Sequence, residues 1–153
     1  MTPGELNKFF EAEGCNNYWI DGVSHGIHSD VDCLGFKNGK WVVYYTERGR
    51  DSEPFFSSHD QDEAIEFYKN HVLSIEHWHV VAFTRQGETA NRYKAVLNDA
   101  GIKVIQNDVP NYSSANDHVY RLFVVNKDIF KAKKLISDVP YFDPEFRERH
   151  AKQ

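Results

Sequence analysis

The sequence has little cysteine and no long apolar run. Cys15 and Cys33 are the only cysteines, and their spacing is unlike the close Cys-x-x-Cys pairs of zinc and redox motifs. Two cysteines are too few for a disulfide framework, so we expect buried or half-buried free thiols. The first residues show no secretion signal, and no apolar run approaches the roughly 20 residues of a membrane span. By default we expect a cytoplasmic protein.

Motifs for nucleophilic catalysis and phosphate binding are also missing. There is no Gly-x-Ser-x-Gly elbow, and no Gly-x-x-x-x-Gly-Lys or Gly-x-Gly-x-x-Gly sequence after a predicted strand. The formal net charge of −5 argues against a general nucleic-acid binder, because phosphate contacts need clustered Lys and Arg. Asp30 with Asp32, or Glu47 with Asp51, could form a paired-carboxylate hydrolase site, although surface carboxylates are common. Our expectation is a protein that is not an enzyme and needs no cofactor.

Eight histidines leave a metal site as an alternative. His77 and His79 lie on the same side of a predicted strand and His71 comes shortly before them, so two or three imidazoles could converge. No fourth ligand stands at a diagnostic interval. We therefore expect no metal site, and a metal-dependent enzyme built on these histidines stays the third hypothesis.

Aromatic residues, in contrast, are abundant. Eleven Phe, eight Tyr and three Trp can supply a sizeable core in one domain or in two small ones. The densest run of β-formers is Lys-Trp-Val-Val-Tyr-Tyr-Thr-Glu-Arg-Gly at residues 40–49. Strand side chains alternate, so Trp41, Val43 and Tyr45 lie on one side and the residues between them on the other. We expect both faces of this strand to be largely covered.

The first half predicts a helix, two or three antiparallel strands and a second helix. Thr2-Pro3-Gly4-Glu5 has the pattern of a capping box, and Asn38-Gly39 is typical of a type I′ hairpin. Residues 54–57 favour an edge strand because Pro54 lacks an N–H donor. Ser58-His59-Asp60-Gln61 predicts a second capping box, before a helix whose buried stripe is Ala64, Ile65, Tyr68 and Val72.

The second half predicts the order β-α-β-β-α, a ferredoxin-like split unit. Strands are expected at residues 78–84, 102–106 and 120–125, with Thr84 and Asn126 as helix caps and a last helical turn at Asp143-Pro144. The predicted fold class is α+β, a mainly antiparallel sheet with helices packed on it. We expect the two halves, residues 1–76 and 77–153, to form one compact unit sharing a core.

Acidic and aromatic residues are interleaved between residues 44 and 66. One interpretation is a solvated turn followed by a helix N-terminus that favours carboxylates. The sharper interpretation is a protein-binding face, in which aromatics supply contact area and carboxylates complement a basic partner. The candidate partner-binding residues are Tyr45, Glu47, Arg48, Asp51, Glu53, Phe55, Asp60 and Asp62.

Several segments resemble the small bacterial immunity proteins of polymorphic and contact-dependent growth inhibition toxin systems. They are residues 5–9 (Glu-Leu-Asn-Lys-Phe), a segment around Trp19, Cys33-Leu34, and the run at 40–49 followed by an acidic helix. The resemblance covers residues 1–75, and its most specific part is the Tyr-Tyr-x-Glu-Arg-Gly ending. It implies a stoichiometric, non-catalytic inhibitor of one cognate toxin C-terminal domain, expected to be a basic nuclease whose active site it blocks.

A second hypothesis belongs to a different class of protein. The ferredoxin-like second half is similar, at the level of the fold, to small regulatory or ligand-binding modules. Its sheet, or the loop at residues 110–117, would then bind a small molecule. Neither hypothesis requires direct contact with nucleic acid or with a membrane.

Overall fold

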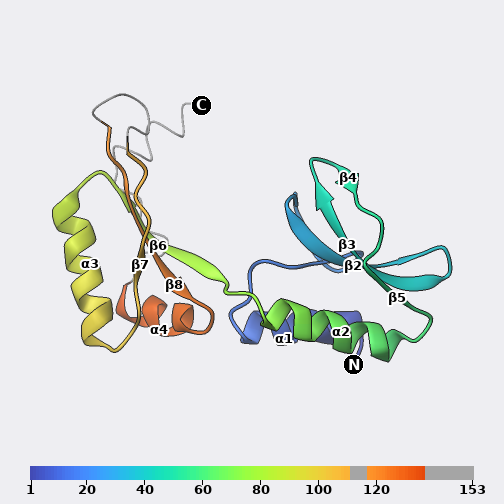
Figure 1. The fold of residues 1–153 in the computed structure, drawn as a ribbon. Coiled ribbons are helices and arrows are strands. Elements are labelled where there is room, and N and C mark those ends of the chain that lie inside the picture. The colour runs from blue at the N-terminus through green and yellow to red at the C-terminus, as the bar shows by residue number, and fades with distance from the viewer. Residues whose placement is uncertain (111–116, 137–153) are drawn as a thin grey trace. The chain divides into compact units, whose positions relative to one another are not determined.

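The computed structural model describes residues 1–110 and 117–136. The chain divides into two compact units, Met1–His77 and Trp78–Gln153, which we call unit 1 and unit 2 (Figure 1). Each unit has its own helices and its own sheet, and pairing is antiparallel everywhere except between the first two strands. The fold class is therefore α+β, as predicted. Among the described residues, no helix has the length and apolar character needed to cross a membrane.

Helix α1 (Pro3–Ala12) begins at the predicted capping box. The backbone N–H of Glu5 donates to Thr2 Oγ1 at 3.1 Å, and the backbone N–H of Thr2 donates to Glu5 Oε1 at 3.3 Å. Gly14 follows the helix with a φ of 73°, a conformation that glycine adopts without strain. The helix start predicted from the sequence is therefore confirmed.

The sheet of unit 1 is organised around its two longest strands. Strand β1 pairs in parallel with β2, β2 pairs antiparallel with β3, and both β4 and β5 pair antiparallel with β3. Asn38 and Gly39 have φ of 52° and 79°, the positive values that a type I′ turn requires at both positions. The turn sets Lys37 opposite Lys40 and so fixes the register of the hairpin. The strands are β1 (Trp19–Ile20), β2 (Val31–Lys37), β3 (Lys40–Glu47), β4 (Arg50–Asp51) and β5 (Phe56–Ser58).

One edge of β3 is closed by three successive pieces of chain. Strand β4 pairs with Thr46 and Glu47, and β5 pairs with residues 41–43. Between these two strands, Ser52 makes the hydrogen bonds to β3. Its backbone N–H donates to Tyr45 O at 2.7 Å, and its Oγ accepts from Tyr45 N at 3.0 Å. Pro54 lies in this connecting segment, where it needs no ladder donor.

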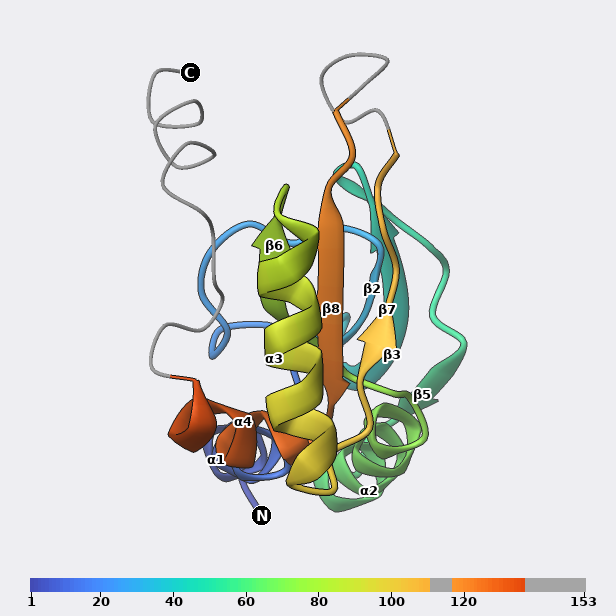
Figure 2. The same cartoon turned by 90° about the vertical axis from the view of Figure 1, so that its left-hand side faces the viewer.

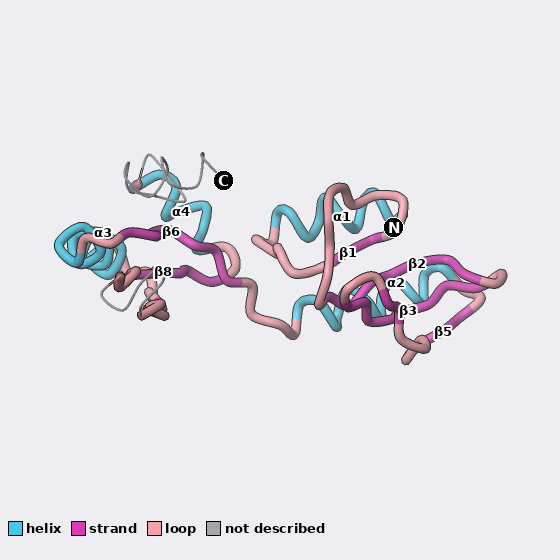
Figure 3. Tube along the Cα trace, turned by 90° about the horizontal axis from the view of Figure 1, so that it is seen from above, coloured by secondary structure: helices cyan, strands magenta, loops and turns pink. Residues whose placement is uncertain are grey.

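Helices α1 and α2 (Gln61–Leu73) lie side by side on one face of the sheet (Figures 1 and 3). The predicted stripe of α2 is buried there, with Tyr68 fully enclosed. The predicted capping box at Ser58 is wrong, because the N-cap is Asp60 and the helix begins at Gln61. The core between helices and sheet contains Leu6, Phe10, Cys15, Ile20, Leu34, Val43, Ala64, Ile65, Tyr68 and Val72.

The opposite face of β2 and β3 is also covered, as the alternation predicted. Val31, Cys33, Val42 and Tyr44 form a smaller buried cluster with Trp19 packed against it. Both cysteines are free and buried. Burial, with a smaller effect of the nearby Glu13 charge, raises the pKa of Cys15 to about 11, and burial raises that of Cys33 to about 12. The thiols stay protonated near neutral pH and are poor nucleophiles.

Unit 2 has the split β-α-β arrangement that its sequence predicted. Strand β8 is central and pairs antiparallel with β6 on one side and β7 on the other. Figure 2 shows α3 lying across one face of this sheet. The core contains Val81, Ala82, Ala90, Leu97, Ile102, Leu122, Val124, Ile129, Ala132 and Ile136. The elements are β6 (Trp78–Thr84), α3 (Gly87–Asp99), β7 (Ile105–Gln106), β8 (Tyr120–Val125) and α4 (Asp128–Leu135).

Three details of unit 2 differ from the prediction. The N-cap of α3 is Gln86 rather than Thr84, whose hydroxyl instead accepts from Gln86 N at 3.0 Å. Asn126 has a φ of 54° and belongs to the turn before α4, whose N-cap is Lys127. The predicted strand at residues 102–106 is regular only at Ile105–Gln106. The helical turn predicted at 143–144 lies outside the described residues.

Candidate functional site

The eight predicted partner-binding residues fall at two separate places in unit 1. Tyr45, Glu47, Arg48 and Asp51 surround the turn between β3 and β4 and line an open hollow of about 660 Å³. Strand β5 pairs with the other end of β3, at residues 41–43, and α2 follows it. At roughly 3.3 Å per residue, six residues of strand separate the two ends of β3 by about 20 Å. Asp60 and Asp62 therefore do not join the group at the turn.

Asp51 is already paired within the chain. Its Oδ2 lies 2.8 Å from Lys37 Nζ, and the same ammonium lies 3.6 Å from the centre of the Tyr44 ring. The hydrogen bonds from Lys37 and Thr46 lower the pKa of Asp51. Its charge is thus partly neutralised at the surface. Asp51 would therefore attract a cationic partner less strongly than an unpaired carboxylate.

Asp60 and Asp62 serve the start of α2. Asp60 Oδ1 accepts from the backbone N–H of Asp62 at 2.9 Å, which caps the helix. Both carboxylates lie at the positive end of the helix dipole, where negative charge is stabilising. Both residues therefore have a structural role at the helix start, and their part in partner binding stays a prediction.

Tyr45 and Arg48 are fixed by hydrogen bonds to the segment before β2. The Tyr45 hydroxyl donates to Asp30 Oδ1 at 3.2 Å, and Arg48 N donates to Ser29 Oγ at 2.9 Å. Partial desolvation and the hydrogen bond to Asp30 raise the pKa of Tyr45. Glu47 and Arg48 remain exposed beside this tyrosine. The turn therefore presents charged side chains of both signs from a fixed backbone.

Phe55 belongs to a second cluster, which includes residues that the sequence analysis did not select for partner binding. Phe55 is 50% exposed, and its ring lies 6.4 Å from that of Phe67 and 5.6 Å from that of His71. His71 Nε2 lies 2.6 Å from Asp32 Oδ2. In the hairpin register Asp32 stands opposite Tyr45, near the end of β3. That register was readable from Asn38-Gly39, and it would have pointed to Asp32.

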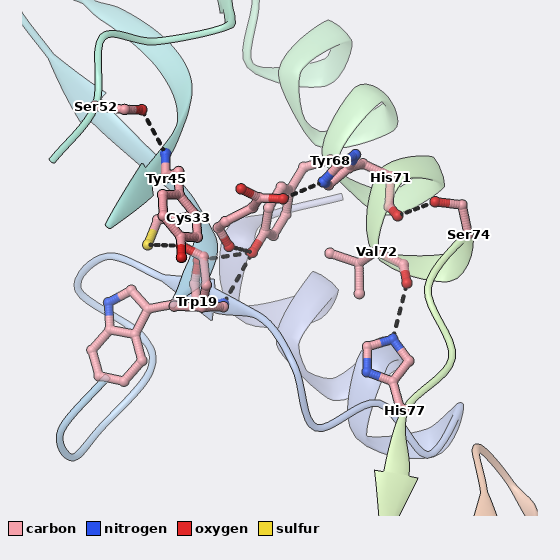
Figure 4. A network of polar contacts seen from close by, with 11 residues as sticks. Trp19, Cys33, Tyr45, Ser52, Tyr68, His71, Val72, Ser74 and His77 are labelled. Atoms are coloured by element: carbon pink, nitrogen blue, oxygen red, sulfur yellow. Dashed lines mark hydrogen bonds and ion pairs between the residues drawn. The ribbon is translucent and has the colours of Figure 1, made fainter. Parts of the chain in front are cut away.

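The backbone behind this cluster is held by one buried phenol (Figure 4). The Tyr68 hydroxyl lies within donating distance of two backbone carbonyls, Asp32 O at 2.6 Å and Trp19 O at 3.1 Å. The same oxygen accepts a hydrogen bond from Trp19 N at 3.0 Å. Burial raises the pKa of Tyr68, so it remains a donor. Tyr68 on α2 therefore ties together β1 and β2 at the point where Asp32 emerges.

The three histidines of the alternative metal site have separate environments. His71 is paired with Asp32, and His79 belongs to strand β6 of unit 2. His77 is 1% exposed; its Nδ1 accepts from Asn16 N and Asn17 N at 3.1 and 3.0 Å, and its Nε2 lies 2.9 Å from Val72 O. In the part of the chain that the structure describes, no group of three or more His, Cys, Asp or Glu side chains is arranged to hold a metal ion.

A second hollow, of about 490 Å³, opens beside α1 in unit 1. Some of its lining residues contact one another: the Tyr18 hydroxyl donates to Asn7 Oδ1 at 2.7 Å, and Trp19 stacks on His28 with ring centres 3.7 Å apart. The alternative hypothesis placed its ligand on the sheet of the second half or in the loop at 110–117. Residues 111–116 of that loop lie outside the described residues.

Charge is distributed very unequally between the two units. Unit 1 has 14 Asp and Glu against 6 Lys and Arg, a formal charge of −8. Unit 2 has 9 Asp and Glu against 12 Lys and Arg, a formal charge of +3. The modest net charge of the chain therefore conceals a strongly acidic unit 1, which is the unit that contains every predicted partner-binding residue.

Comparisons of the chain with protein-family models, with curated proteins and with solved structures found no match.

Proposed function

We propose that this protein is a bacterial immunity protein that binds one cognate toxin domain in the cytoplasm and neutralises it without catalysis. The observation that carries the proposal is the formal charge of −8 on unit 1, combined with the exposed aromatic ring of Phe55. A nuclease domain must present cations to its substrate, and an acidic protein surface can occupy them. Protein interfaces combine such complementarity with a few aromatic anchors.

The predicted residues contribute differently to this proposed interface. Glu47 and Glu53 are exposed, and Tyr45 and Arg48 flank Glu47 on a turn with fixed backbone. Asp51 is paired with Lys37, and Asp60 caps α2. We expect Glu47, Glu53 and Phe55 to supply more of the binding free energy than Asp51, Asp60 and Asp62.

The direct test uses the toxin domain encoded next to this reading frame. Calorimetry of the purified pair should give a 1:1 complex that weakens as salt is raised, and co-expression should protect cells from the toxin. Glu47→Lys should raise the dissociation constant by about tenfold or more at low salt. Asp99→Lys, the same change of charge on the exposed end of α3 in unit 2, is the matched control and should bind normally.

Two results would contradict the proposal. One is the absence of both a complex and cellular protection. The other is turnover of a substrate by the isolated protein. A thermal shift with a small metabolite, in the absence of any protein partner, would instead favour the ligand-binding alternative.

A further inference from the structure

The cluster around Phe55 has the composition of a site for a single cationic side chain. Phe67 stacks on Phe56 at 4.0 Å and lies nearly parallel to His71, with 6.2 Å between ring centres and 5° between planes. The ring of Phe55 is tilted by 59° from that of Phe67 and by 54° from that of His71. The aromatic surface is therefore rigid, yet half of Phe55 remains in solvent.

The carboxylate of Asp32, which is paired with His71 of this cluster, can accept a further hydrogen bond. The side chain of Asp32 is 27% exposed, and its Oδ2 is paired with His71. Its backbone carbonyl is held by Tyr68, so the side chain projects from a fixed point. Asp32 Oδ1 has no hydrogen-bond partner within residues 1–110 and 117–136. A second donor can therefore join Asp32 without displacing His71.

The chain does not place a permanent cation of its own here. Among the contacts of the described residues, no Lys or Arg pairs with Asp32, and none lies over Phe55 or Phe67. Lys37 pairs with Asp51, and Lys69 lies over Phe9. Unit 1 is nevertheless strongly acidic, so the surrounding charge favours a cation from outside.

We propose that Phe55, His71 and Asp32 receive an arginine side chain of the protein partner, its guanidinium stacked on Phe55 and donating to Asp32. Guanidinium is the cation that suits both surfaces, because it is planar, stacks on aromatic faces and donates to a carboxylate through a fork of N–H groups. A lysine would supply charge without the planar stacking. The inference deepens the proposed function and rests on it for the source of the arginine.

The arginine site is tested on the full-length, isotope-labelled protein with short blocked peptides as probes. The peptide Gly-Arg-Gly should produce saturable NMR shifts at Phe55, His71 and the residues next to Asp32. Replacing its arginine by citrulline, which is planar but uncharged, should raise the dissociation constant by about tenfold, since a hydrogen bond to a charged group contributes that much. Gly-Lys-Gly should fall between the two.

Matched variants separate this site from general charge effects. Asp32→Asn and Phe55→Leu should each weaken the arginine peptide severalfold. Phe36→Leu, at a phenylalanine that is 57% exposed near the hairpin turn, and Asp99→Asn, at an exposed carboxylate of α3, should leave binding unchanged. Unsaturable shifts, equal binding of the citrulline peptide, or equal losses in the control variants would overturn the inference.

The cognate toxin separates failure of the site from failure of the function. If the toxin binds the wild type and the Asp32→Asn and Phe55→Leu variants with equal affinity, the arginine site is wrong and the immunity function stands. If the arginine peptide binds as described but no neighbouring toxin binds or is neutralised, the site stands and the proposed function falls.

Discussion

His77 shows how one buried polar side chain can fix the end of unit 1. With Nδ1 accepting from two backbone N–H groups and Nε2 facing the Val72 carbonyl, the ring is the neutral tautomer that carries its proton on Nε2. It fastens the segment after α1 to the last turn of α2. A histidine that sequence spacing offered as a metal ligand is therefore a structural hydrogen-bonding group.

Replacing His77 by leucine should destabilise the protein by roughly 2 to 4 kcal/mol, because two backbone donors and one acceptor lose their buried partner. Urea unfolding followed by tryptophan fluorescence measures the change. His25→Leu, at an exposed position in the loop before β2, is the control and should stay within about 0.5 kcal/mol of wild type. Equal stability of the two variants would contradict the role given to His77.

The Lys37–Asp51 pair gives a prediction for pH. The pKa of Asp51 is lower in the folded state than its ordinary 3.8, so its stabilising contribution is complete above that value and is lost as pH falls through the lowered pKa. Because both side chains are substantially exposed, the contribution should be no more than about 0.5 kcal/mol. Unfolding midpoints of wild type and Asp51→Asn should differ slightly at pH 7 and converge as the pH falls below 3.8 and through the lowered pKa. A difference that grows on acidification would refute this account.

Sequence reasoning at this scale succeeded where strand alternation decides burial. Val43 and Val42 are buried on opposite faces of β3, as period two requires. It failed where two side chains meet across the fold, as Asp32 and His71 do from positions far apart in the chain. No local pattern encodes such a contact, because it depends on where α2 lies on the sheet.

At the scale of elements, the N-cap of α2 separates a structural role from a binding role. Asp60→Ala should lower stability by about 1 kcal/mol, whereas Asp60→Asn should be nearly neutral, because asparagine caps helices as well as aspartate does. Thermal unfolding measures both. If Asp60→Asn weakens binding of the proposed toxin partner while keeping stability, Asp60 belongs to the interface as well. If Asp60→Ala is as stable as wild type, the cap contributes little.

Elements bounded by local chemistry were the ones that the sequence predicted well. In the capping box of α1 and in the Asn38-Gly39 turn, residues within a four-residue segment determine the backbone conformation. No distant contact is therefore needed to specify either element. At Ser58, two candidate caps lie two residues apart, and pairing of β5 with β3 extends the strand to Ser58 and leaves the cap to Asp60. Similarly, β7 is short because only two of its residues pair with β8.

At the scale of the whole molecule, each unit has a hydrophobic core cluster among its described residues. Leu34→Ala should therefore reduce amide hydrogen-exchange protection throughout unit 1 and leave unit 2 close to wild type; Leu122→Ala should do the reverse. Both leucines are fully buried, so the two variants control for each other. Loss of protection in both units from either substitution would show that the cores unfold together.

The closed edge of β3 has a consequence for the protein in a crowded cell. An open edge strand offers its N–H and C=O groups to any other extended chain, and this is a common route to fibre formation. Here Ser52 occupies the ladder positions between β4 and β5, and Pro54 cannot donate to an incoming strand. Strand β3 therefore cannot pair with a neighbouring molecule on this side, and the exposed edge passes to β4 and β5, which at two and three residues offer a much shorter template for polymerisation.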